Sequence, residues 1–203
     1  MIPFILSSLF SAALPEISPV FVPTVVQSVQ IAAKVPELPL YSQFGDITPV
    51  KWRKVACGVT SLAMVINYYE PGATSPDTLL RQGIDDGAYI SGAGWSHQGL
   101  VLLSEKYGFE GKTYDLSGSS NAAAFAKFKE ILKDGPAIVS VHYKMDPKNP
   151  IPHLVVLNGF DGDTLYYNDP AAREAGKEIS AGDFQKAWKK RFIVIRPTEE
   201  KEK

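Results

Sequence analysis

The order of two hydrophobic patterns along this chain is the feature that most limits its fold. Several earlier segments carry apolar residues with the 3.6-residue period of buried helices. Runs rich in β-branched residues and bounded by turn residues come later and predict strands. Because helices come first and strands follow, we expect an α+β fold in which N-terminal helices pack against an antiparallel sheet. The predicted helices are 58–69, 96–107 and 120–133, and the predicted strands are 137–143, 153–159, 164–168 and 192–196.

A further short helix is predicted just before the last strand. Ser180 and Asp183 have the spacing of a capping box, in which side chains satisfy the free N–H groups of a first helical turn. Phe184 and Trp188 follow at i, i+4 and give this helix one apolar side.

The composition is that of an ordinary soluble domain. The chain has 203 residues, of which 45% are hydrophobic and 21% charged, and its net charge is −1. These values suit one globular domain with a full core. A near-neutral chain without basic clusters gives no indication of nucleic-acid binding or of a polybasic membrane patch.

The N-terminus differs from the rest of the chain. Between Met1 and Ala33 the only charged side chain is that of Glu16. Residues 2–14 form an apolar stretch of the length of a signal-peptide core, and Ser11 and Ala13 resemble a small-x-small cleavage site. The stretch is short for a bilayer span, and no Lys or Arg precedes it.

Prolines then recur through a charge-poor segment, which prevents a continuous helix and favours an extended linker. We therefore expect residues 1–35 to be an export signal or weak membrane anchor followed by a linker, and the protein to be secreted or surface-bound. An N-terminal arm packed on the domain, and a cytoplasmic location, are the alternatives. The domain itself is expected at 36–198, with a charged tail at 199–203.

Cys57 is the only cysteine and stands where the first predicted helix begins. A thiol at a helix N-terminus faces free N–H groups and the positive end of the helix dipole, which favour the nucleophilic thiolate. One cysteine cannot form an internal disulfide and is a poor basis for a structural zinc site. No pair of histidines shows short ligand spacing, so we expect no metal. The alternative is that Cys57 is a small buried hydrophobic residue.

His153 and Asp169 flank a predicted hairpin whose turn lies at 161–163. A three-residue loop at 160–162 would place His153 directly opposite Asp169 on one face of the sheet. A two-residue loop at 161–162 would instead put the two side chains on opposite faces. The turn therefore decides whether the two side chains can meet.

A cysteine, a histidine and a carboxylate are the minimum set for thiol catalysis. The imidazole takes the thiol proton and later protonates the leaving group, while the carboxylate orients the imidazole. Taken alone, His153 could be a hydrogen-bonded core residue, and Asp169 a turn former before Pro170. Asn168 is an alternative orienting amide, although its strand parity points it to the other face.

Other polar and aromatic residues have candidate roles in a substrate groove. The Gln43 amide or the backbone N–H of Cys57 could stabilise an oxyanion. Trp95 and His97 are candidate substrate-binding residues, with core packing and solvent exposure as their respective alternatives. His142 is expected to be structural or to lie at the rim. Groove-lining loops are expected around 70–95 and 143–152.

Several short motifs occur in a fixed order: Leu40-Tyr41-Ser42-Gln43, 57–65 (CGVTSLAMV), 94–101 (GWSHQGLV), 153–156 (HLVV), 159–161 (GFD) and 167–170 (YNDP). Together they resemble peptidase domains related to the bacteriocin-processing, double-glycine leader peptidases, over about 36–196. The resemblance implies a papain-like cysteine peptidase fold. By matched position it implies Cys57 as nucleophile, His153 as general base and acid, Asp169 as orienting carboxylate, and Gln43 as oxyanion donor. Nothing resembles the ATP-binding or membrane-spanning parts of bacteriocin exporters, so leader processing does not follow.

The expected function is hydrolysis of peptide or isopeptide bonds through an acyl-thioester on Cys57. We expect a monomer that needs no cofactor and acts on a peptide or protein substrate. Two alternatives keep the same groove. One is a non-catalytic peptide-binding surface module, and the other is a thiol acyltransferase that uses an amine in place of water.

Overall fold

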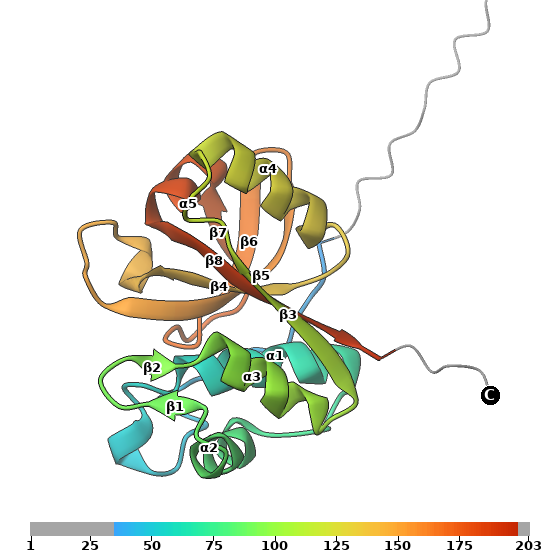
Figure 1. Cartoon of the computed structure of the whole chain (residues 1–203), viewed down its shortest axis with the longest axis vertical. Coiled ribbons are helices and arrows are strands. Elements are labelled where there is room, and N and C mark those ends of the chain that lie inside the picture. Colours follow the sequence, from blue (N-terminus) through green and yellow to red (C-terminus); the bar gives the residue numbers. More distant parts are fainter. Residues whose placement is uncertain (1–34, 199–203) are drawn as a thin grey trace, which may run out of the picture. The chain divides into compact units, whose positions relative to one another are not determined.

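The structure is a computed structural model that describes residues 35–198 (Figure 1). The predicted export segment, apart from Val35, and the charged tail lie outside the described residues. The helices are α1 (Cys57–Tyr69), α2 (Pro76–Asp85), α3 (His97–Glu105), α4 (Asn121–Leu132) and α5 (Ala181–Ala187), with 3-10 turns at η1 (Val50–Trp52) and η2 (Tyr143–Met145). The strands are β1 (Tyr89–Ile90), β2 (Gly94–Trp95), β3 (Phe109–Asp115), β4 (Ala137–His142), β5 (Pro152–Asp161), β6 (Thr164–Asn168), β7 (Lys177–Ser180) and β8 (Trp188–Pro197).

The predicted helices are confirmed, and side-chain caps begin all of them except α1, which follows Ala56. Ser96, Ser120 and Ser180 each accept a hydrogen bond from the backbone N–H three residues later. Such caps satisfy N–H groups that have no partner within the helix. The predicted short helix is α5, although Trp188 belongs to β8 and not to the helix.

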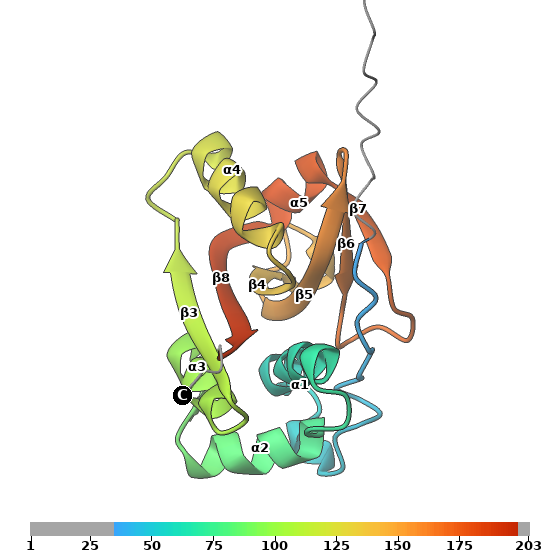
Figure 2. The same cartoon turned by 90° about the vertical axis from the view of Figure 1, so that its right-hand side faces the viewer.

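One six-stranded antiparallel sheet has the order β3-β8-β4-β5-β6-β7. Helices α1 and α3 pack on one side of it, with α2 packed against these two helices, and α4 and α5 pack on the other side (Figures 1 and 2). The α+β class with an antiparallel sheet is therefore confirmed. Because β4 is central and covered on both sides, its residues from Ala137 to Val141 are all buried.

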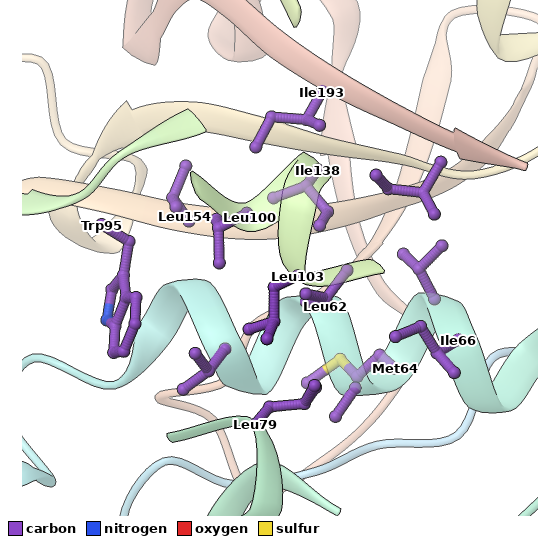
Figure 3. Packing of buried hydrophobic residues seen from close by; sticks show 14 of the residues in the cluster. Leu62, Met64, Ile66, Leu79, Trp95, Leu100, Leu103, Ile138, Leu154 and Ile193 are labelled. Carbon is purple, nitrogen blue, oxygen red and sulfur yellow. The ribbon is translucent and has the colours of Figure 1, made fainter. Parts of the chain in front are cut away.

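The core beneath α1 fixes the helix that carries Cys57. All but the first and the last two residues of α1 are buried. Figure 3 shows Leu62 and Ile66 of this helix packed below Ile138, Leu154 and Ile193 of the sheet. A helix held along its whole length places its first residue firmly against the sheet.

The interpretation of 70–95 as loops is wrong for 76–85, which form α2. Its start carries ordinary signals, because Ser75 accepts a hydrogen bond from the Thr78 N–H and Pro76 occupies the first turn. Strand β3 was also missed. It lies at the sheet edge, and mostly polar residues such as Glu110 and Lys112 hide its pattern. Among residues 35–198, no helix is both long and apolar enough to span a membrane.

Candidate active site

A cavity of about 860 Å³ opens between the helical side and the sheet. Cys57 from α1 and His153 from β5 both line it, as do Gln43, Trp95 and His97. Asp169 lies behind His153, on the side away from the cavity lining. Within the described part of the chain, no cluster of three or more His, Cys, Asp or Glu residues could hold a metal ion.

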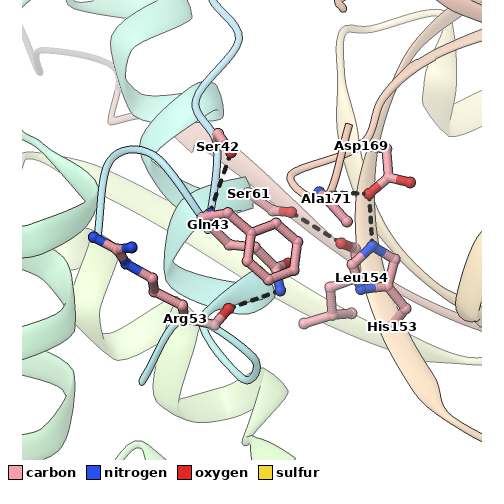
Figure 4. Close-up of polar contacts among 9 residues, drawn as sticks. Ser42, Gln43, Arg53, Ser61, His153, Leu154, Asp169 and Ala171 are labelled. Carbon is pink, nitrogen blue, oxygen red and sulfur yellow. Dashed lines mark hydrogen bonds and ion pairs between the residues drawn. The ribbon is translucent and has the colours of Figure 1, made fainter. Parts of the chain in front are cut away.

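His153 and Asp169 meet in a short, buried hydrogen bond. The distance from His153 Nε2 to Asp169 Oδ1 is 2.7 Å, and the residues are only 5% and 9% exposed (Figure 4). The same Oδ1 accepts a hydrogen bond from the Ala171 backbone N–H at 2.8 Å. Tyr143 packs edge-on against the imidazole, with ring centroids 5.1 Å apart. The ring is therefore held on two sides.

The turn of this hairpin is not either of the loops expected from the sequence. Asp161 pairs with Thr164, so the turn residues are Gly162 and Asp163. Gly162 has φ +54°, a left-handed conformation that glycine adopts at little cost. The expected pairing of His153 directly opposite Asp169 is therefore wrong, although the two side chains do meet.

A bulge at Asn158 brings the His153 and Asp169 side chains back to the same face of the sheet. Leu157 pairs with Tyr167 and Gly159 with Tyr166, so Asn158 is an extra residue in β5. One extra residue reverses which face every following side chain points to. Without it, the turn would direct His153 and Asp169 to opposite faces. With it, Asp169 follows the end of β6 on the same face as His153 and reaches it diagonally.

Two neighbouring groups keep the His153 imidazole protonated. Burial by itself would lower its pKa, but hydrogen bonds to Asp169 and Cys57 and the charges of both raise the pKa to about 9. Burial would likewise raise the pKa of Asp169, yet the His153 hydrogen bond and charge and the Ala171 N–H hold it below its usual value. Cys57, His153 and Asp169 thus form one electrostatic unit.

Gln43 lies at the edge of this unit and is 3% exposed. Its Nε2 donates a hydrogen bond to the Arg53 carbonyl at 2.9 Å, which fixes the orientation of the amide (Figure 4). Its backbone N–H donates to the Pro170 carbonyl at 2.8 Å, next to Asp169. The Gln43 side chain is therefore tied to the loop before α1, and its backbone to the segment that carries Asp169.

Trp95 both packs in the core and lines the cavity. Its Nε1 donates a hydrogen bond to the Val55 carbonyl at 2.6 Å, two residues before Cys57. Its ring lies so close to Gly58 that a Cβ there would come within 2.6 Å of Trp95 Cγ. Trp95 therefore supports the start of α1 beside Cys57.

This contact predicts that Gly58→Ala lowers the free energy of unfolding by about 1–3 kcal/mol, the usual cost of overpacking a core. The loss opposes helix propensity, which favours alanine over glycine. Urea unfolding followed by circular dichroism measures it. Gly118→Ala is the control, because no atom lies within 4 Å of a Cβ at that position. Equal unfolding free energies for the two variants would refute the tight Trp95 contact.

The structure corrects or defines three further histidine and asparagine roles. His97 is not solvent-exposed: its Nε2 lies 2.9 Å from Ser140 Oγ, and burial followed by the Arg191 charge lowers its pKa. His142 is structural, since its Nδ1 lies 2.6 Å from the Asn149 carbonyl. Asn168 does not orient His153. Its side chain ties the N-terminal segment to the hairpin by donating to the Leu38 carbonyl.

Several cavity residues were not identified from the sequence. They are Ser140 from β4 and Lys189 and Arg191 from β8. Only the sheet pairing brings these segments together, so spacing along the chain gives no signal for them. The expected loop regions do contribute, through Tyr89 and 92–95 on one side and Tyr143, Ile151 and Pro152 on the other.

This fold, with a cysteine, a histidine and a carboxylate gathered at a groove, defines the class of papain-like cysteine peptidase domains. The model of the Peptidase_C39 like family matches residues 35–192, and the chain belongs to that family. Among curated proteins, the chain is 28% identical over 167 residues to the uncharacterized protein YvpB of Bacillus subtilis (strain 168). The match covers 66% of this chain and 64% of that protein's length.

Solved structures agree with the fold. A double glycine motif protease from an AMS/PCAT transporter, solved in complex with the leader peptide, is 26% identical with a TM-score of 0.54, over 80% of this chain and 94% of that one. The peptidase domain of Streptococcus ComA is 23% identical with a TM-score of 0.55, over 71% of this chain and 93% of that one. A C39-like peptidase from Bacillus anthracis is 19% identical with a TM-score of 0.59, over 81% and 96%.

Proposed function

We propose that this chain is a cysteine peptidase that cleaves peptide bonds through an acyl-thioester on Cys57. The observation that carries the proposal is the buried His153–Asp169 hydrogen bond, with Cys57 lining the same cavity as His153 and helping to raise the pKa of its imidazole. Because Asp169 occupies Nε2, Nδ1 is the ring nitrogen that serves the thiol. Family membership and the leader peptide bound to one structural relative support a peptide substrate.

The proposed steps use Cys57 and His153, which line the cavity, and a water molecule. The Cys57 sulfur attacks the scissile carbonyl carbon, and the imidazolium of His153 gives its proton to the leaving amine as the C–N bond breaks. Water then attacks the thioester carbonyl and loses a proton to His153. The C–S bond breaks, the acid is released, and the thiolate and imidazolium are restored. Asp169 holds the ring and stabilises its charge throughout.

Gln43 is the proposed donor to the oxyanion. An amide NH₂ has two hydrogens, and the Arg53 carbonyl accepts one of them while the residue lines the cavity. The backbone N–H of Cys57, in the first turn of α1, is the second donor. Donors fixed before the reaction begins stabilise the developing charge at no reorganisation cost.

Mass-spectrometric profiling of a peptide library tests the proposal. The wild type should cleave library peptides, and Cys57→Ala should cleave none. A peptide aldehyde should form an adduct with Cys57 in the wild type alone. Peptide binding without cleavage and without an adduct would refute the enzyme and identify a non-catalytic binding module.

Removing the proposed oxyanion donor should act on turnover. We expect Gln43→Ala to lower kcat by about 10²-fold with little change in KM, because the donor binds charge that exists only in the transition state. Gln98→Ala is the matched control, since Gln98 is exposed on α3 and outside the cavity lining. Steady-state kinetics on the best library peptide measures both constants. A change confined to KM would contradict the assignment.

A further inference from the structure

An irregularity in β8 lies against the cavity wall. Val139 of β4 pairs with Phe192, and Val141 pairs with Trp188, so β8 carries two more residues than β4 over this stretch. Lys190, in the middle, has φ +56°, in the left-handed region that residues with side chains rarely adopt. Bulges and strained residues of this kind occur often beside binding sites, where they redirect side chains.

The contacts of Lys190 explain how the bulge is held. Its Nζ donates a hydrogen bond to the Ser119 carbonyl at 2.8 Å, and its carbonyl accepts one from the Leu116 N–H at 2.9 Å. Both partners belong to the segment that follows β3. Lys190 is thereby held away from the cavity, whereas its neighbours Lys189 and Arg191 line it.

The bulge gives the cavity an excess of positive charge. Lys54 lines the cavity as well, from the loop before Cys57, and no Asp or Glu is among the described lining residues. The chain as a whole has a net charge of −1, so composition does not produce this excess. Asp115 is the nearby counter-charge, but it lies 3.8 Å from Arg191 and both side chains are more than half exposed. Such a pair is weak and leaves Arg191 available to a ligand.

The sheet order gives the distance of these cations from the scissile bond. His153 lies on β5, Ser140 on the neighbouring β4, and the bulge on β8 beyond it. Two strand spacings amount to roughly 10 Å, which an extended peptide covers in about three residues. Ser140 and His97, hydrogen-bonded to each other, line the cavity between the two positions.

We infer that Lys189 and Arg191 form a subsite that binds an acidic side chain of the peptide substrate, about three residues from the scissile bond. The inference rests on the proposed peptidase function and specifies its substrate class. Lys54 adds a long-range attraction for acidic peptides, and high salt weakens it.

A set of ten-residue peptides with blocked ends tests the subsite. The peptides share one sequence, and each replaces a single position of it with Glu, Gln or Lys. We measure kcat/KM with the wild type, and binding to Cys57→Ala by fluorescence anisotropy with one label on all peptides. At one position about three residues from the scissile bond, the Glu peptide should have about fivefold higher kcat/KM and about fivefold higher affinity than the Gln peptide. The Lys peptide should have the lowest values of both. The double variant Lys189→Gln with Arg191→Gln should abolish the preference for the Glu peptide. The double variant Lys189→Glu with Arg191→Glu should instead prefer the Lys peptide.

The control is Lys127→Gln with Lys186→Gln, which removes two positive charges from exposed helix positions outside the cavity lining. This variant should keep the preference for Glu. Cleavage or binding that is equal for Glu and Gln at every position overturns the subsite and leaves the peptidase standing. Selective binding of Glu peptides without cleavage overturns the peptidase and supports the subsite. Neither binding nor cleavage of any peptide overturns both.

Discussion

His153→Ala is expected to lower kcat/KM for peptide cleavage by about 10⁴-fold, because in the proposed mechanism His153 both accepts and donates the proton. The imidazole is also the proposed partner that stabilises the thiolate. The reactivity of Cys57 should therefore be lower in His153→Ala even when no substrate is present. Iodoacetamide labelling followed by mass spectrometry measures this directly. Cys57 should be alkylated rapidly below pH 7 in the wild type and orders of magnitude more slowly in His153→Ala.

His142→Ala is the matched control for this variant. His142 lies one residue before Tyr143, but its ring contacts the Asn149 carbonyl and does not line the cavity. We expect this variant to keep wild-type labelling and turnover. Equal labelling rates in the wild type and His153→Ala would contradict an ion pair between Cys57 and His153. Circular dichroism establishes that each variant is folded.

The sequence was enough to predict which side chains gather at the site, because each stands at a marked place in the chain. Cys57 begins an apolar helix, His153 is the second residue of a mostly buried strand, and Asp169 follows the partner strand just before a proline. These marks are local, and the short motifs shared with the family add to them. The distances, burial and shared hydrogen bonds come from packing, which no local pattern encodes.

The hairpin shows where reasoning from local patterns fails. The expected register was wrong, because it placed the loop at the wrong residues and assumed a regular strand. Asn158 and Gly159 did carry a usable signal, since a glycine inside a strand often marks a bulge or a close backbone approach. A Cβ on Gly159 would lie only 3.3 Å from Val35, so that strand passes close to the N-terminal segment.

The β8 bulge was beyond prediction for a different reason. The run from Trp188 to Arg191 contains no glycine or proline, and nothing in it indicates a left-handed residue. Lys190 adopts that conformation because the segment after β3 supplies both of its hydrogen-bond partners. Tertiary contacts here override local preference, so charged residues that look like an ordinary solvated strand become part of the cavity wall.

Replacing Asp169 with alanine and with asparagine should separate its two roles. Alanine leaves the His153 Nε2 without its partner in a buried site, and we expect kcat/KM to fall by about 10³-fold. Asparagine keeps an oxygen that can accept the same 2.7 Å hydrogen bond but removes the charge. Its loss at pH 6 should be much smaller than that of alanine, because the ring stays oriented.

Loss of the Asp169 charge in Asp169→Asn should change the pH dependence of kcat/KM. The pKa of His153 is raised to about 9, with Asp169 and Cys57 as the groups that raise it. The wild type should therefore keep its imidazolium, and its activity, up to about pH 9. In Asp169→Asn the alkaline limb of the kcat/KM profile should move to lower pH by about one unit or more. Asp161→Asn, an exposed position on the same hairpin, should leave the limb in place.

The raised pKa of His153 also makes the free energy of unfolding depend on pH. A histidine whose folded pKa lies above its unfolded value of 6.5 stabilises the fold fully below pH 6.5, and this contribution is lost as pH rises through about 9. Asp169, whose pKa is lowered, contributes above its unfolded pKa of 3.8 and loses that contribution in acid. Urea unfolding at pH 6 and pH 9.5 should show a smaller difference in Asp169→Asn than in the wild type. An identical difference would mean that the carboxylate only positions the ring, and the ion-pair mechanism would then lack its electrostatic basis.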